Sequence, residues 1–169
     1  MAALLLCAAS AANAGSGQAI GKAVVVSQLS FLSVEELEFG NILPSTAAGA
    51  VTVAPNGART RTGGVTLVGG GLVQPARFAG KGSFNQTVLI SLSAPSFILT
   101  RISGTETMIL DTIVIGSTPT AILTTTPQGF LIGSPTGIFN FPVGGTLRVN
   151  ANQVPGDYQG NLTITLNYQ

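Results

Sequence analysis

The end of the chain alternates strictly between two kinds of side chain. Between Tyr158 and Gln169 the odd-numbered positions are all polar, whereas the even-numbered ones are apolar, aromatic or glycine. Because successive side chains of a β-strand point to opposite faces, this pattern predicts one half-buried strand that runs to Gln169. Chain ends usually fray unless something holds them, so we expect this strand to be used for pairing. Its inward set is Tyr158, Gly160, Leu162, Ile164, Leu166 and Tyr168.

Composition narrows the class of protein. Only 8% of the residues are charged and the net charge is +1, whereas charged residues make up roughly 25% of an average soluble domain. Low charge with many β-branched residues favours a sheet protein that packs on neighbours over a freely diffusing enzyme. The chain has no basic cluster of the kind that binds nucleic acid or a membrane surface. We therefore expect neither of these partners.

The rest of the chain is punctuated in the manner of an all-β protein. Clusters of Gly, Pro, Asn and Ser recur at intervals of about eight to twelve residues, which predicts an antiparallel sandwich or barrel. We expect one domain over residues 27–169, after an N-terminal extension at 15–26. Before the final strand, strands are expected at residues 22–34, 35–43, 49–54, 64–68, 74–79, 87–92, 97–101, 105–115, 120–125, 137–141 and 145–151.

Residues 1–14 have the features of a targeting segment. The run is short and apolar and ends in Ala12-Asn13-Ala14, which predicts a secretory signal cut before Gly15. The positive region that normally precedes such a run is missing, so we expect the signal to be truncated at its start. A buried helix and a lipoprotein anchor at Cys7 are weaker alternatives. With cleavage the product is secreted and retains no cysteine, so no disulfide supports it.

Catalysis is disfavoured by what the chain lacks. It contains no histidine and no cysteine after cleavage, so the usual general base and thiolate are missing. Residues 17–22 resemble a phosphate loop only weakly, because Ala23 stands where a magnesium-binding hydroxyl belongs. Glu35, Glu36 and Glu38 form the one acidic cluster, for which a solvated strand edge is favoured over a calcium site. We expect no enzyme, no cofactor and no metal.

A second apolar segment lies near the other end of the expected mature chain. It follows a glycine-led, uncharged stretch and could be an ordinary strand or a donor that pairs with another subunit. As a donor it leaves two registers open, with either Ile20, Val24 and Val26 or the alternate residues inserted. The candidate donor residues are Ala19, Ile20, Ala23, Val24, Val25 and Val26.

Three features together resemble a known family. Chaperone–usher pilins end in an alternating strand with a penultimate aromatic residue and a glycine fourteen places from the end, where this chain has Tyr168 and Gly156. The segment Leu37-Glu38-Phe39-Gly40 is similar to a signature of the pilin-like bacterial family "domain of unknown function 4402". Spore coat protein U-type pilins of archaic chaperone–usher systems carry a similar segment. The resemblance spans roughly residues 23–169, although archaic pilins often contain a disulfide that this chain cannot form.

The resemblance implies a fold and a function. It implies an immunoglobulin-like β-sandwich that lacks its last strand, which a periplasmic chaperone supplies first and the next subunit's N-terminal segment supplies later. An outer-membrane usher would assemble a head-to-tail polymer of this chain at the cell surface, for adhesion or biofilm formation. The alternative is a monomeric secreted β-sandwich that acts as a binding or adhesin module. The absence of Trp and the scarcity of Tyr argue against a sugar site, and a secreted hydrolase is the weakest candidate.

Overall fold

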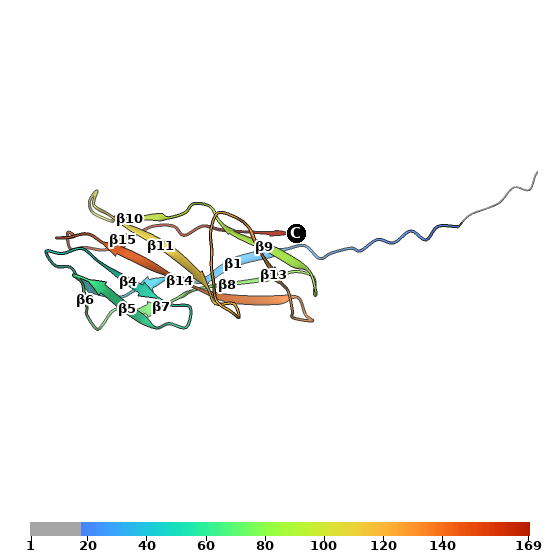
Figure 1. Ribbon diagram of the computed structural model, residues 1–169, viewed down its shortest axis with the longest axis horizontal. Coiled ribbons are helices and arrows are strands. Elements are labelled where there is room, and N and C mark those ends of the chain that lie inside the picture. Colours follow the sequence, from blue (N-terminus) through green and yellow to red (C-terminus); the bar gives the residue numbers. More distant parts are fainter. Residues whose placement is uncertain (1–17) are drawn as a thin grey trace, which may run out of the picture.

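The computed structural model describes residues 18–169 and is all-β, as the sequence predicts. Its sheets are antiparallel and curl into a β-sandwich. Figure 1 shows an elongated body with the N-terminal segment leaving from one end. The expected signal at residues 1–14 and its cleavage point before Gly15 lie outside the described residues. Within residues 18–169, no helix is long and apolar enough to cross a membrane.

The strands follow the turn signals of the sequence, with several of them broken into short pieces. Among residues 18–169 they are, in chain order, β1 (Ser30–Glu35), β2 (Glu38–Phe39), β3 (Ile42–Leu43), β4 (Gly49–Val53), β5 (Arg59–Gly63), β6 (Thr66–Leu67), β7 (Val73–Gln74), β8 (Ala76–Lys81), β9 (Thr87–Leu92), β10 (Phe97–Arg101), β11 (Thr107–Ile115), β12 (Ala121–Ile122), β13 (Gln128–Leu131), β14 (Ile138–Val149), β15 (Tyr158–Gln159) and β16 (Ile164–Tyr168).

The larger sheet is organised around β14. Its main path runs β1-β8-β14-β11-β10-β15, with β4 joining β14 to β5 and β12 pairing with β11. One edge of β14 pairs first with β8 and then, after Gly144, with β4. At this change of partner a Cβ on Gly144 would collide with the carbonyl oxygen of Val53. The expectation of two separate strands at 137–141 and 145–151 is therefore wrong, because the glycines serve close strand packing and not a turn.

The smaller sheet covers the inner face of the larger one. Its order is β13-β9-β16. Its inward side chains, such as Ile90 and Ile164, share one hydrophobic core with those of β8 and β14. At the centre, the rings of Phe31, Phe78 and Phe141 stack, with centroids 5.3 Å apart for Phe31–Phe78 and 5.8 Å for Phe78–Phe141. This stack ties β1 to the middle of the sandwich.

Other boundaries differ from those expected. Pairing in the expected 22–34 strand begins only at Ser30, and residues 18–29 form no strand. The expected 64–68 strand is shortened to β6, and β5 and β13 were not expected at all. The final alternating run is interrupted at residues 160–163 between β15 and β16. The missed strands are polar or glycine-containing edge pieces, in which the alternation of apolar residues is weak.

Candidate functional site: a groove between two sheet edges

The C-terminal segment, residues 156–169, forms one side of the candidate site. β15 pairs with β10, and β16 pairs with β9, both antiparallel. Ile164 is 8% exposed, and the flanking Leu162 and Leu166 are half-buried. The hydroxyl-bearing Thr163 and Thr165 between them are exposed. The even-numbered side chains of this segment therefore face the core.

The backbone of the same segment presents a free edge. The Ser93 amide donates to the Thr163 carbonyl at 3.1 Å, and the Gln169 amide donates to the Thr87 carbonyl at 3.1 Å. In an antiparallel ladder both polar groups of a residue point to the same neighbour, so the odd-numbered residues bond to β9. The amides and carbonyls of Ile164, Leu166 and Tyr168 then point to the opposite edge. Within residues 18–169, no strand pairs with that edge.

The N-terminal strands form the other side. β1 pairs only with β8 and is one end of the larger sheet, whose other end is β15. At one end of the body the two edges meet, because the Tyr168 hydroxyl donates to the Ser27 carbonyl at 2.8 Å and accepts from the Ser83 amide at 2.8 Å. We infer that these unpaired edges border one groove, between β1–β3 and residues 156–169, and call it the edge groove. This closed end is its Tyr168 end.

The edge groove opens into a cavity at its far end, the Tyr158 end. The cavity has a volume of about 630 Å³ and lies between residues 37–44 and residues 153–158. Leu99, Met108 and Leu147 line it from the sheet. Of the described residues that line it, only Glu38 and Asp157 carry a charge. The cavity is thus lined by both apolar and polar groups, with two carboxylates among them, and is built from segments far apart in the sequence.

The four signature residues all line this cavity. Phe39 is buried, and Leu37 packs against the core. Gly40 has a φ of +66°, and a Cβ there would meet a side-chain carbon of Val73 at 2.7 Å. The signature therefore shapes the bend between β2 and β3 that forms one wall of the cavity.

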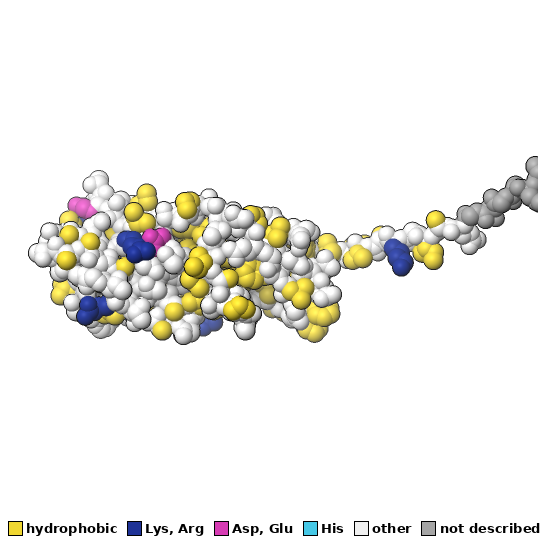
Figure 2. Space-filling view, in the orientation of Figure 1, with side chains coloured by type: hydrophobic (Ala, Val, Ile, Leu, Met, Phe, Trp, Pro, Cys, Tyr) yellow, Lys and Arg dark blue, Asp and Glu magenta, His cyan; other side chains and the backbone are white. Residues whose placement is uncertain are grey.

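The candidate donor segment lies away from the groove. Ile20 is 88% exposed, Val24 82% and Val25 94%. Ala19 and Ala23 are also exposed, and none of these residues is in a strand. Figure 2 shows apolar side chains along this segment where it projects from the body. The structure thus contains an open sheet edge and an unpaired apolar segment, and it does not bring them together.

At the Tyr158 end, polar contacts fix the chain where it turns into β15. The Tyr158 hydroxyl donates to the Val154 carbonyl at 2.7 Å and accepts from the Gln153 amide group at 2.7 Å. The Arg101 guanidinium lies beside Gly156, where a Cβ would meet its side chain at 2.9 Å. Arg101 also pairs with Glu106 at 2.6 Å between Nε and Oε2. These contacts hold residues 153–158 as the second wall of the cavity.

The Arg101–Glu106 ion pair predicts that the stability of the fold decreases in acidic solution. The hydrogen bond from Arg101 lowers the pKa of the Glu106 carboxyl below its usual value of 4.5. A carboxyl whose pKa is lower in the folded state stabilises the fold at pH values above its unfolded-state pKa. That stabilisation is lost as the pH falls through the folded-state pKa. Glu106→Gln should therefore lower the melting temperature more at about pH 7 than at a pH below the folded-state pKa of Glu106. An equal effect at both pH values would show that the charge of Glu106 does not contribute.

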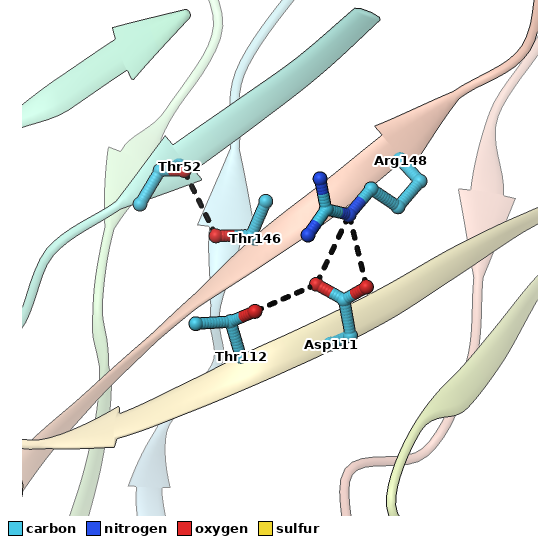
Figure 3. A network of polar contacts seen from close by, with 5 residues as sticks. All are labelled: Thr52, Asp111, Thr112, Thr146 and Arg148. Carbon is cyan, nitrogen blue, oxygen red and sulfur yellow. Dashed lines mark hydrogen bonds and ion pairs between the residues drawn. The ribbon is translucent and has the colours of Figure 1, made fainter. Parts of the chain in front are cut away.

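A second polar cluster lies on the central strands and is structural. Figure 3 shows Thr52 and Thr146 joined by their hydroxyls, and Arg148 bonded to Asp111. Thr112 has a φ of 50° at the β-bulge of β11 and donates to Asp111 at 3.0 Å. The hydrogen bond with Asp111 raises the pKa of the Arg148 guanidinium. These contacts are made within the cluster and hold β4, β14 and β11 in register.

The acidic cluster of the sequence is divided in the structure. Glu35 forms an ion pair with Arg77 at 2.8 Å, whereas Glu38 lies at the cavity. Over residues 18–169, no group of three or more acidic, His or Cys side chains is placed to hold a metal ion. Glu35 and Glu38 therefore make different contacts and do not form one common site.

Comparison with known proteins identifies the family. No curated protein matches the chain significantly. The model of the family described as "Domain of unknown function (DUF4402)" matches residues 29–168, a range that includes the signature, β1 and the C-terminal segment up to Tyr168. The chain therefore belongs to the DUF4402 family.

Proposed function

We propose that this protein is the structural subunit of a bacterial surface fibre and polymerises by donor-strand complementation. In this process an extended segment of one subunit adds a strand to the open sheet of another. The edge groove is the observation that supports the proposal most directly. It is bordered by β1 and the C-terminal segment, two edges that have no partner on their groove side within residues 18–169.

The energetics of an open groove favour its being filled. An exposed edge above apolar side chains is prone to aggregate unless another strand covers it. Insertion of three apolar donor side chains, such as Ile20, Val24 and Val26, would stabilise the complex by on the order of 5–9 kcal/mol before ordering costs. Ladder hydrogen bonds to Ile164, Leu166 and Tyr168 would add to this. Such a contact between subunits would dissociate slowly, as a fibre under tension requires.

The expected partners follow from the resemblance to chaperone–usher pilins. A periplasmic chaperone would cover the groove before assembly, and an outer-membrane usher would exchange it for the next subunit. The fibre would be secreted through the periplasm and displayed at the cell surface for adhesion or biofilm formation. The protein has no catalytic role in this proposal, and it uses no cofactor.

Removal of the donor segment tests this function. Deletion of residues 15–26 should convert a protein that sediments as polymers into one that sediments as a monomer. The deletion should not disturb the core, because residues 18–26 are exposed. A shorter deletion of residues 15–18 keeps Ala19–Val26 and should still polymerise. Polymers from the longer deletion, or monomers from the intact chain, would instead favour the self-contained binding module.

A further inference from the structure

The occupant that best fits the edge groove is the N-terminal segment of a second copy. A molecule's own segment leaves at the Tyr168 end, where the Ser27 amide donates to the Ser83 hydroxyl at 2.6 Å and its carbonyl accepts from Tyr168. To fold back, it would need a tight turn within residues 24–28. That stretch is Val-Val-Val-Ser-Gln, in which three β-branched valines disfavour a tight turn and Ser27 is the one residue of a type common in turns. The segment is therefore directed outward, toward another molecule.

The two ends of the body fix the direction of insertion. The segment leaves at the Tyr168 end, whereas the cavity lies at the Tyr158 end, and Figure 1 shows β15 and the N-terminal segment at opposite ends of the body. In a linear assembly, Val26 of one copy then lies nearest Tyr158 of the next, and Ile20 lies deeper in its groove. The donor therefore runs antiparallel to the C-terminal segment. Because the two contacting surfaces differ, the contact repeats into an open filament.

Given the proposed function, we propose that the donor inserts in one register, with Ile20, Lys22, Val24 and Val26 facing the core of the neighbouring copy. The alternate residues Ala19, Gly21, Ala23 and Val25 then face solvent. This register also pairs Lys22 of one copy with Glu38 of the next.

Side-chain size supports the register. The cavity of about 630 Å³ is lined by large apolar side chains from the sheet. The proposed register delivers two valines, Val24 and Val26, to the cavity end of the groove, followed by Ile20. The alternate register would deliver Val25 with Ala23 and leave the three larger side chains in water, which costs apolar burial. Filling the cavity therefore favours the even-numbered face.

The position of Lys22 along the groove follows from strand geometry. Lys22 lies four positions before Val26, which is about 13 Å along an extended strand. Tyr158 pairs with Arg101, and Phe97 lies four positions before Arg101 on the same strand, β10. With Val26 beside Tyr158, Lys22 therefore lies at the level of Phe97.

Of the two acidic residues that line the cavity, Glu38 is the one nearer that level. Phe97 pairs with Leu110, and a Cβ placed on Gly145 would lie 2.9 Å from Leu110 and 3.3 Å from Leu37. The side chain of Leu37 therefore lies near the level expected for Lys22, and we infer that Glu38, the next residue and a lining residue of the cavity, is within reach of it. Lys22 is the one charged residue between Gln18 and Val26, and Glu38 lines the cavity. Opposite charges at matching positions favour the proposed register and disfavour slipped ones.

Paired substitutions in the full chain test which face is inserted. Val24→Asp with Val26→Asp should reduce the polymerised fraction by about tenfold or more, because it places two carboxylates against Leu99, Met108 and Leu147 in a cavity that already holds Glu38 and Asp157. The matched control, Ala23→Asp with Val25→Asp, should change the fraction by less than about twofold, since these carboxylates remain in water. Sedimentation measures both fractions, and an unchanged monomer melting temperature shows that the fold is intact. A larger effect from the control pair, or equal effects, would overturn the register.

A charge exchange tests the Lys22–Glu38 contact. Lys22→Glu alone should reduce the polymerised fraction by about fivefold, and adding Glu38→Lys in the same chain should restore it. Glu36→Lys is the control, because Glu36 is exposed and does not line the cavity; it should not restore assembly. Restoration by Glu36→Lys, or none by Glu38→Lys, would contradict the contact.

These outcomes separate the register from the function. If deletion of residues 15–26 abolishes polymers but the odd-numbered pair is the damaging one, donor exchange holds and the register is wrong. If the deleted chain still polymerises, the proposed function itself fails.

Discussion

Replacing Ile164 with Asp is expected to destabilise the subunit by roughly 4 kcal/mol or more, enough to prevent folding in a marginally stable domain. Ile164 is 8% exposed and belongs to the core that both sheets share. The substitution removes apolar contacts and places a carboxyl among the apolar side chains of the core. Urea unfolding of the purified variant, or its loss from the soluble fraction, measures the effect.

The neighbouring position provides the control. Thr163→Asp introduces the same carboxylate on the exposed face of the same segment, where it stays hydrated. Its cost should be within about 0.5 kcal/mol, as for most surface substitutions. Similar losses at both positions would contradict the assignment of the even-numbered residues to the core.

The C-terminal segment shows how far sequence alone predicts the fold. Its alternation predicts a strand with one inward face, and the structure places Leu162, Ile164, Leu166 and Tyr168 inward. The period of two is a local property of the backbone, so it is visible without knowledge of the partner strands. The break between β15 and β16 cannot be seen in the sequence pattern. It occurs where the C-terminal segment changes its pairing partner from β10 to β9.

Other features depend on contacts that no local pattern encodes. Pro142 to Gly145 has the composition of a turn, yet β14 continues through it because β14 exchanges β8 for β4 there. β5 has the sequence Arg-Thr-Arg-Thr-Gly and lacks an apolar face, as suits an edge strand. In both cases the tertiary position of the strand outweighs its local composition.

The candidate site was predicted only in part. The sequence indicates the candidate donor segment and the C-terminal strand, and the signature marks residues 37–40. The cavity that these residues line also requires Leu99, Met108 and Leu147, which belong to three different strands. Only the fold brings these strands under the signature, so no sequence motif could have identified them.

The most direct test of the account is whether a peptide of residues 18–26 stabilises the protein that lacks residues 15–26. A ligand that binds only the folded state adds about 2.7 kcal/mol at one hundred times its dissociation constant. For a domain of this size, that corresponds to a rise of about 5–10 °C in melting temperature. The same peptide with Val24→Asp and Val26→Asp is the control and should produce no rise. A concentration-dependent rise with the native peptide alone is the predicted result; a melting temperature that stays constant at every peptide concentration would contradict donor-strand complementation.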